Sequence, residues 1–446
     1  MNRGHFSKAG FILASAGSAV GLGNIWKFPY IAGDNGGGAF VLVYLITVLL
    51  VGLPLLISEI MLGNMAQKEP VSAFEHLAPN AKKQWRLGGF AFLGGFFILT
   101  FYSVVIGWLF YYIYLTLTAL PATPQEAEAL FMGMLTGDIR TQLLFHTLSM
   151  VIVASIVSKG IKGGIEKANS YMMPILMGII LVMFFYAVSF DTFGKAFAFM
   201  FEPDFSKLTP TSILIAVGHA FFTLSIGMAT IMTYASFSGK QTRILGSSLW
   251  IVGIDTAIAL FAGLMMFTFM FGFGMDPGKG PGLVFISMPA VFYQMGAIGN
   301  IFAVLFFIAL AFAGLTSAIS LLEPTVAYLN QRKKLDRSKA TWYTAGAIWL
   351  VGVFALLSNV KGFEWLSIGG KGLFDSLDFV TSAVMLPLGG LAIALFIGYV
   401  MDKNNTEMFL EHHGFGKKLF EGWFYTVKYI VPIGVIIVML NSLGVF

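Results

Sequence analysis

The sequence predicts an all-α polytopic membrane protein, and three observations lead to that class. Of its 446 residues, 57% are hydrophobic and only 11% are charged, whereas an ordinary soluble domain carries about 25% charged residues. The apolar residues gather in eleven stretches, each close to the roughly 20 residues that a bilayer-spanning helix needs. The polar links are short, so no soluble domain is expected. The chain contains no cysteine, which excludes disulfides, thiolate metal sites and cysteine nucleophiles.

The eleven expected spans are apolar runs, and every link between them except the first contains a Lys or Arg residue. In chain order the spans are 9–33, 39–65, 88–118, 141–158, 168–190, 211–235, 244–274, 299–329, 340–358, 375–401 and 422–444. After the seventh span, a Pro-rich loop from Asp276 to Pro281 leads into the apolar stretch 282–297. That stretch is too short to span, so we expect a helix lying over the outer face.

The Lys and Arg residues are distributed unequally between the two sets of links. If the N-terminus is inside, nineteen of them face the cytoplasm and six face outward, while Lys27 and Lys428 lie within spans. Because cytoplasmic loops carry the excess of Lys and Arg, we expect a cytoplasmic N-terminus and, after eleven spans, an external C-terminus. A cleaved signal peptide is not expected, because the first apolar run continues through Gly17, Gly21 and Asn24 without a cleavage site.

Two spans contain small and polar residues where an apolar helix is expected. The first span reads GSAVGLGN over residues 17–24, and the sixth reads FTLSIGMAT over residues 222–230. Glycine destabilises a helix by about 1 kcal/mol relative to alanine, and a broken helix in a bilayer is tolerated only where it is buried or lines a cavity. Both spans are therefore expected to be interrupted. The alternative is that the spacing Gly17-x-x-x-Gly21 serves close helix packing.

The two interrupted spans occupy corresponding positions in the chain. The first opens a five-span half at 9–190, the sixth opens another at 211–401, and the helix at 422–444 is additional. Interrupted spans at corresponding positions of two halves are typical of transporters built from inverted repeats, which bind substrate near the bilayer midplane. We expect one such transporter domain over residues 1–446.

Several motifs carry a resemblance to a known family. They are GSAVGLGNIWKFP at 17–29, NGGGAF at 35–40, GLPLLISE at 52–59, the interruption of the sixth span, FAGLTS at 312–317 and DSLDF at 375–379. In this order they resemble the neurotransmitter:sodium symporter family over nearly the whole chain, and the count of eleven spans is similar to its bacterial amino-acid members. The resemblance implies sodium-coupled, alternating-access symport of a neutral hydrophobic or aromatic L-amino acid in the bacterial inner membrane.

The resemblance also implies two sodium sites, because interrupted helices supply the oxygen ligands that a hard cation requires. Site 1 would consist of Ala19, Asn24, Thr223 and Asp255 together with the substrate carboxylate. Site 2 would consist of the carbonyls of Gly17, Val20 and Ala313 and the hydroxyls of Thr316 and Ser317. The alternative for the two hydroxyls is hydrogen bonding within their own helix.

Asp255 is informative because it lies within a span, where a carboxylate costs about 2.5–3.5 kcal/mol and usually marks a partner or an ion. Span seven offers no cation to pair with it. Chloride-dependent members of the family hold the anion near this position; here His219 stands where Gln is usual, and Ala259 stands where some chloride-independent members have an acid. We therefore expect Asp255 to supply the negative charge, so that chloride is not required. His219 is expected to be a hydrogen-bonded structural residue, with proton relay as the alternative.

The substrate site is expected at the interruption of the first span. The amides of Leu22 and Gly23 begin a half-helix, and a helix N-terminus favours an anion. The resemblance places the substrate carboxylate there with the Tyr102 hydroxyl, and the amine near Ser225. The side-chain pocket would be lined by Ile98, Phe222, Met228, Ser317 and Leu321. None of these is charged, which argues against acidic or basic substrates; ordinary helix packing is the alternative for the apolar ones.

The same resemblance implies gate residues, which close the substrate site on the outer and inner sides of the membrane. Lys27 and Asp378 resemble an outer pair, and Tyr102 and Phe222 would form a lid beneath it. At the inner side, Arg3 is the candidate cation near the N-terminus, and the region of Asn330 and Gln331 lacks the acid that some members place there. Gly164 and Pro174, ten residues apart, resemble a device that unwinds span five and lets water reach site 2; interhelical packing is the alternative.

No Ser/His/Asp set or phosphate-binding loop appears in the sequence, so an enzyme is not expected. The expected partners are an amino-acid substrate, sodium and the lipid bilayer, without nucleic acid or an obligate protein partner. Two alternatives stay open. One is a proton-coupled amino-acid transporter in which Asp255 and His219 titrate, and the other is an amino-acid-binding channel or sensor.

Overall fold

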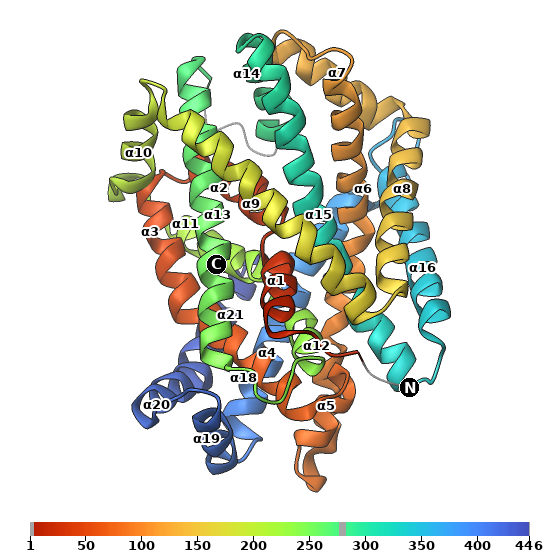
Figure 1. Ribbon diagram of the computed structural model, residues 1–446, viewed down its shortest axis with the longest axis vertical. Helices are drawn as coiled ribbons and strands as arrows, with labels where there is room; N and C mark the ends of the chain where they lie inside the picture. Colours follow the sequence, from red (N-terminus) through yellow and green to blue (C-terminus); the bar gives the residue numbers. More distant parts are fainter. Residues whose placement is uncertain (1–3, 276–281, 446) are drawn as a thin grey trace.

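The computed structural model describes residues 4–275 and 282–445, so Arg3 and the expected loop from Asp276 to Pro281 lie outside the described residues. Long helices run between the two ends of the molecule (Figure 1). The helices at one end are α7 (Pro124–Gly137) and α14 (Met288–Gln294), and those at the other end are α5 (Pro70–Leu77), α19 (Lys403–His412) and α20 (Lys417–Tyr425). The all-α class is confirmed.

Nine helical segments of the described chain are long and apolar enough to cross a membrane. They are Gly38–Ala66, Lys82–Thr116, Ile139–Ser158, Ile161–Val188, Ile244–Gly272, Ala297–Gln331, Arg337–Leu357, Leu373–Tyr399 and Lys417–Ser442. The first expected span is a bent pair, Lys8–Ala19 and Gly23–Asp34, and the sixth is divided into two shorter helices. Each expected span therefore falls on helix, while eleven complete crossings stay a prediction.

The individual α-helices within these segments keep the labels of Figure 1. They are α3 (Gly38–Thr47), α4 (Leu53–Ala66), α6 (Phe92–Thr116), α8 (Ile139–Ser158), α9 (Lys167–Val188), α13 (Ile244–Gly272), α15 (Ala297–Gln331), α16 (Arg337–Leu357), α17 (Leu373–Val380), α18 (Leu386–Tyr399) and α21 (Val431–Ser442). The link after α9 contains α10 (Phe193–Phe201) and a short 3-10 turn, Phe205–Lys207. A longer 3-10 segment, Asn80–Ala91, leads into α6.

Widened π-helical turns mark several of the spans, and most of them have a common cause. The turns Gly23–Lys27, Val48–Gly52, Leu283–Ser287, Thr381–Met385 and Thr426–Ile430 each end two residues before a proline. Proline has no amide hydrogen, and its ring clashes with the carbonyl four residues earlier. The helix accommodates each proline by widening the preceding turn. A sixth turn, Ile161–Glu166, precedes α9 without a proline nearby.

The structure also differs from the expected elements at three places. Span five begins at Ile161 rather than at 168, because Gly160 adopts a φ of 90° and starts the helix early. Span eleven likewise begins with α20 at Lys417 rather than at 422. The link between spans nine and ten forms a two-stranded antiparallel hairpin, β1 (Ser367–Ile368) and β2 (Lys371–Gly372), whose turn residues Gly369 and Gly370 both have positive φ, as tight hairpin turns require.

Both expected interruptions are present. Helix α1 (Lys8–Ala19) ends at an extended Val20, and the chain bends by 44° before α2 (Phe28–Asp34). Helix α11 (Pro210–Thr223) is separated from α12 (Thr230–Ser236) by an unwound segment, residues 224–229. Within that segment Ser225 and Ala229 have φ values of 53° and 54°. Such conformations cost about 1–3 kcal/mol each and persist only where the surroundings hold them.

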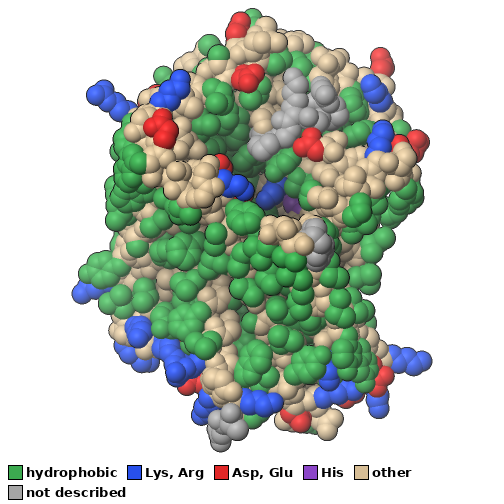
Figure 2. Space-filling view, turned by 180° about the vertical axis from the view of Figure 1, so that it is seen from behind, with side chains coloured by type: hydrophobic (Ala, Val, Ile, Leu, Met, Phe, Trp, Pro, Cys, Tyr) green, Lys and Arg blue, Asp and Glu red, His purple; other side chains and the backbone are tan. Residues whose placement is uncertain are grey.

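Close backbone contact with α18 holds part of this unwound segment. A Cβ atom on Gly227 would lie 2.3 Å from the carbonyl oxygen of Leu386, and one on Gly389 would lie 1.7 Å from the carbonyl oxygen of Gly227. Both glycines are therefore required by the packing. Figure 2 shows a broad area of hydrophobic side chains across the face in view, Lys and Arg side chains gathered near its lower end, and a hollow in its upper half.

Candidate functional site

The two helix breaks face one another around the carbonyl oxygen of Ser18. Ser225, in the unwound segment, donates a hydrogen bond of 2.7 Å from its hydroxyl to this oxygen. Ser317, on α15, donates to the same oxygen at 3.3 Å. Both hydroxyl groups lie in the protein interior. Spans one, six and eight therefore meet at a buried polar point, which lies where the substrate site is predicted from the sequence.

A small cavity of about 20 Å³ lies at this point. Its lining includes eight of the nine predicted substrate residues: Gly23, Ile98, Tyr102, Phe222, Ser225, Met228, Ser317 and Leu321. No side chain that lines it is charged, and Ser18, Ala19 and Gly21 contribute only small groups. A cavity of this volume has room for about one water molecule, so the lining side chains must move apart before any larger molecule can enter.

The ninth residue, Leu22, lies just outside that lining but contacts it. Its amide donates a hydrogen bond of 3.2 Å to the hydroxyl oxygen of Tyr102. The two groups expected to hold a substrate carboxylate are thus adjacent, and in this structure the Tyr102 oxygen accepts the Leu22 N–H. Gly21 permits this approach, because a Cβ atom there would lie 2.5 Å from the Ser317 hydroxyl and 3.1 Å from that of Tyr102.

A larger cavity of about 290 Å³ is lined by all four predicted gate residues, Lys27, Tyr102, Phe222 and Asp378, and also by Leu22. The Lys27 ammonium lies 4.5 Å from the centre of the Phe222 ring. Asp378 instead accepts a hydrogen bond of 3.2 Å from Ser382. Among the ion pairs of the described residues none joins Lys27 to Asp378. The four predicted gate residues therefore line one cavity, and the Lys27 ammonium is not paired with the Asp378 carboxylate.

Three of the four predicted site 1 residues form one buried cluster. Asn24 donates to the Asp255 carboxylate at 2.8 Å and to the Asp255 backbone carbonyl at 2.9 Å. Thr223 donates to the same carboxylate at 3.1 Å. These residues come from the turn after the first break, from α11 and from α13. Ala19 lies nearby in the lining of the small cavity. The cluster is rich in oxygen, as a sodium ion requires.

The described residues offer no group of three or more His, Cys, Asp or Glu side chains that could hold a metal ion. Transition metals favour such imidazole, thiolate and carboxylate sets. The oxygen atoms assembled here come mainly from carbonyls, hydroxyls, one amide and one carboxylate. The donor set therefore matches a hard cation such as sodium.

The sequence left two possibilities for the hydroxyls of site 2, sodium ligation or hydrogen bonding within their own helix. Thr316 and Ser317 differ in this respect. The Thr316 hydroxyl bonds the carbonyls of Phe312 and Ala313 at 3.0 and 3.1 Å, within its own helix. Ser317 instead reaches across to α1, as described above. On α1 the Val20 amide donates to Ala16 at 2.6 Å, and Gly17 packs against α9. The five predicted ligands thus lie on α15 and at the C-terminal end of α1, with Val20 directly after its last residue.

Glu59 is a functional candidate for which the sequence reasoning assigned no role. It lies on α4 and is fully buried. One carboxylate oxygen accepts from the Gly227 amide at 2.7 Å, and the other accepts from the Met232 amide at 3.1 Å. The side chain therefore binds the amides that the break in span six leaves without helical partners. The available signal was its position at membrane depth in the motif GLPLLISE, where a carboxylate marks a partner.

Replacing Glu59 by Gln is expected to destabilise this break. The amide group keeps one acceptor but turns a donor toward a backbone N–H, and a hydrogen bond to a charged group is worth about 1.5–3 kcal/mol. We expect a lower melting temperature of the purified protein in detergent and a loss of most uptake. The exposed Glu128→Gln substitution on α7 serves as the control. An unchanged melting temperature in Glu59→Gln would show that the carboxylate does not hold the segment.

The expected hydrogen bonding of His219 is wrong. Neither ring nitrogen has a hydrogen-bond partner among the described residues, although the side chain is buried. The imidazole lies beside the ring of Phe28 at 6.0 Å and that of Tyr44 at 5.4 Å. The imidazole is therefore surrounded by aromatic rings rather than by the hydrogen-bond donors or acceptors that were expected. Ala259 is buried on α13, as its small apolar side chain allows.

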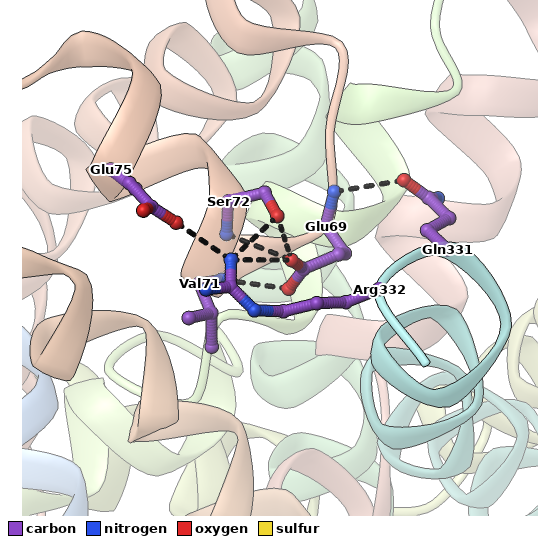
Figure 3. A network of polar contacts seen from close by, with 6 residues as sticks. All are labelled: Glu69, Val71, Ser72, Glu75, Gln331 and Arg332. Carbon is purple, nitrogen blue, oxygen red and sulfur yellow. Dashed lines mark hydrogen bonds and ion pairs between the residues drawn. The ribbon is translucent and has the colours of Figure 1, made fainter. Parts of the chain in front are cut away.

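At the opposite end of the molecule, the end of α15 is bound to α5. Arg332 donates to the Glu75 carboxylate at 2.7 Å and to the Ser72 hydroxyl at 3.1 Å, and Gln331 accepts from the Glu69 amide (Figure 3). The hydrogen bond from Arg332 lowers the pKa of the Glu75 carboxyl. Gln331 therefore belongs to a contact between two elements that the sequence did not connect.

A buried acid near this end was also missed. Glu323, fully buried on α15, pairs with Arg337 at the start of α16 at 2.6 Å. Arg337 also donates to the carbonyl of Val157, at the end of α8. One guanidinium thus joins three spans. Arg3, the expected inner-gate cation, lies outside the described residues.

Gly164 fits the packing alternative in this structure. A Cβ atom there would lie 2.0 Å from the carbonyl oxygen of Ile156 on α8, so the close approach requires glycine. Pro174 lies inside α9, which continues through it as helix. The expected unwinding between Gly164 and Pro174 is therefore not seen here and stays a prediction.

Two interrupted helices that meet at a buried cavity are typical of secondary membrane transporters. The family model described as "Sodium:neurotransmitter symporter family" matches residues 3–129 and 131–446. The chain belongs to this family, and it is accordingly a sodium-dependent transporter and not an enzyme.

Individual relatives agree with this assignment. "Uncharacterized sodium-dependent transporter YhdH" of Bacillus subtilis (strain 168) is 38% identical, and the alignment covers 98% of this chain and 97% of the relative. An uncharacterized sodium-dependent transporter of Haemophilus influenzae is 32% identical with the same coverage. Among solved structures, that of MhsT in complex with L-phenylalanine matches with a TM-score of 0.90 and 38% identity, over 99% of this chain and 100% of the other.

Proposed function

We propose that this protein is a sodium-coupled symporter of neutral, hydrophobic or aromatic L-amino acids. The observation that carries the proposal is the uncharged cavity between the two helix breaks. An acidic or basic side chain would be buried there without a partner, at a high cost. The L-phenylalanine bound to MhsT, a protein 38% identical to this one, supports the same substrate class.

The substrate would bind with its two charged groups at the two breaks. Its carboxylate replaces the contact between the Leu22 amide and the Tyr102 hydroxyl and gains the Gly23 amide at the start of a half-helix, which favours an anion. Its amine meets Ser225 and the carbonyls freed by the unwound segment. Its side chain lies among the remaining lining residues, namely Ile98, Phe222, Met228, Ser317 and Leu321.

Two sodium ions would travel with the substrate. We assign the first to site 1, formed by Ala19, Asn24, Thr223 and Asp255, and the second to site 2, formed by Gly17, Val20, Ala313, Thr316 and Ser317. The buried oxygen cluster around Asp255 supports site 1. The facing of α1 and α15 at Ser18 supports site 2.

Transport is proposed to be independent of chloride. Asp255 is buried, carries a negative charge when ionised, and has no ion-pair partner among the described residues. A bound sodium ion provides that partner, so no halide is needed to balance the site.

Alternating access would occur between the five-span halves 9–190 and 211–401, with the helix at 422–444 outside them. Closure of the outer side would move the Lys27 ammonium from the Phe222 ring to the Asp378 carboxylate. The bacterial relatives and the Lys and Arg distribution support a bacterial inner membrane with a cytoplasmic N-terminus and an external C-terminus.

The test uses the purified protein in proteoliposomes with radiolabelled L-phenylalanine. We expect accumulation above the external concentration only with an inward sodium gradient, whether or not chloride is replaced by gluconate. Accumulation driven by a proton gradient without sodium would establish proton coupling instead. Equilibration without accumulation under every gradient would indicate a channel or sensor. A competition panel of the twenty amino acids then ranks the substrates.

Met228 is expected to limit the size of the substrate side chain. It lines the small cavity and is nearly fully buried, so Met228→Phe adds volume where no space remains. Overpacking costs about 1–3 kcal/mol, which corresponds to roughly a 5- to 150-fold rise in KM for tryptophan or tyrosine. We expect a smaller rise for alanine or valine. The exposed Met408→Phe on α19 is the control, and equal effects on large and small substrates would place Met228 away from them.

A further inference from the structure

Asn169, in the first turn of α9, has a buried amide oxygen without a partner. The side chain is fully buried, and its amide nitrogen donates to the carbonyl of Ile165 at 2.9 Å. Its Oδ1 atom has no hydrogen-bond partner among the described residues. The reverse orientation of the amide would place Oδ1 against the Ile165 carbonyl oxygen, so this bond determines which atom points away from α9. A buried acceptor in this situation requires an explanation, and a bound ion is one that the neighbouring groups can test.

The free oxygen lies against Gly17 of α1. A Cβ atom on Gly17 would be 2.2 Å from Oδ1 of Asn169, and it would also contact the Met173 side chain at 3.1 Å. With any larger residue at position 17 the Asn169 side chain would have to move, so glycine allows this oxygen to lie against α1. Because Gly17 lies two residues before the end of α1, the oxygen faces the part of the helix where the hydrogen-bond ladder stops.

The break in span one leaves the carbonyl of Gly17 without its usual donor. In a continuous helix the Gly21 amide would bond this carbonyl. Here the Gly21 amide donates to Oδ1 of Asn24 at 3.0 Å, and the next amide, that of Leu22, donates to Tyr102. The Gly17 carbonyl and the Asn169 amide oxygen are thus two acceptors in the same buried region, and a cation is a ligand that both can bind.

We propose that Oδ1 of Asn169 is a further ligand of sodium site 2, supplied by span five. The inference rests on the proposed function, because it takes the assignment of site 2 from there. Spans one and eight supply the other ligands, so this contact would add a third helix to the site. Asn169 lies between Gly164 and Pro174 in the sequence. A bound ion would therefore hold this part of span five helical, and unwinding of the segment would withdraw one ligand and release the ion inward.

The experiment measures sodium itself, by equilibrium binding of ²²Na⁺ to the purified protein in detergent and by the rise in melting temperature when sodium replaces potassium. Asn169→Leu removes the oxygen at similar size, Asn169→Asp retains it, and Met173→Leu changes the neighbouring contact with Gly17 without removing an oxygen ligand. We expect Asn169→Leu to weaken binding of the second ion at least tenfold and to reduce the sodium-dependent rise in melting temperature. Asn169→Asp and Met173→Leu should retain both.

The outcomes separate this inference from the proposed function. Wild-type sodium binding together with unchanged binding in Asn169→Leu would overturn the role of Asn169 and leave sodium coupling intact. Absence of sodium binding in the wild-type protein would overturn the proposed function. Asn169→Leu could also lower the melting temperature equally in sodium and in potassium, so that the rise on replacing potassium by sodium is preserved. That result would assign the residue to packing alone.

Discussion

Thr316→Val combined with Ser317→Ala is expected to abolish most sodium-dependent uptake while the protein remains folded. The two substitutions remove hydroxyl oxygens at nearly constant volume, at the point where α15 faces the broken end of α1. We expect the sodium concentration for half-maximal uptake to rise roughly tenfold or more, which is about 1.4 kcal/mol of binding free energy. The measurement is the sodium dependence of amino-acid uptake in proteoliposomes.

The control for this double substitution addresses the hydrogen bonds within α15. Thr316 bonds the carbonyl four residues earlier in its own helix, and Thr344 on α16 makes the same kind of bond to Ala340 at 2.8 Å. Thr344→Val should therefore reproduce any effect of losing such a bond without changing the sodium dependence of uptake. If the double variant keeps the wild-type sodium dependence, the two hydroxyls make only the protein–protein hydrogen bonds seen here, Thr316 within α15 and Ser317 to α1, and the assignment of site 2 fails.

Asp255→Asn is also expected to raise the sodium requirement of transport strongly. The substitution removes a negative charge while it keeps the shape of the side chain. Two sodium ions and a substrate ammonium bring three positive charges against one substrate carboxylate, and in a low-dielectric interior such an imbalance is costly. Asp255 offsets it, with Asn24 and Thr223 holding the carboxylate. We expect the wild-type protein to transport equally well in chloride and gluconate, and Asp255→Asn to require at least about tenfold more sodium.

The same variant tests where the negative charge comes from. Added chloride is expected to restore part of the activity of Asp255→Asn, because an anion beside site 1 would replace the lost carboxylate charge. Asp191→Asn, at an exposed carboxylate after α9, is the control. Wild-type uptake that stops when chloride is removed would show that Asp255 does not provide the charge.

The fold class could be predicted because membrane spans depend on local composition. An apolar run of sufficient length becomes a helix in a bilayer, where every backbone group must find a partner within its own segment. The interruptions at 17–24 and 222–230 were predicted for the same local reason, since glycine and polar residues weaken the helix in which they occur. The resemblance of motifs to a family added the residues around the breaks, and the structure places most of them around one cavity.

Side-chain partners could not be predicted in this way. Lys27 lies over the ring of Phe222 rather than beside Asp378, because three separate spans determine which group is within reach of the ammonium. His219 lacks the hydrogen bonds expected of it, because its surroundings are aromatic rings contributed by two other helices. Glu59 appeared in a recognised motif, yet only the packing of α4 against the unwound segment shows what it binds.

The sequence by itself determined that this protein is a bundle of membrane helices, interrupted in its first and sixth spans, and that its motifs are those of sodium-coupled transporters. The tertiary structure alone decided how the interruptions are satisfied. Glu59 binds an amide 168 residues away, and Asn24 binds a carboxylate 231 residues away. Helix formation follows from neighbours in the chain, whereas the partners of a freed amide or carbonyl depend on which helices pack together and at what distance.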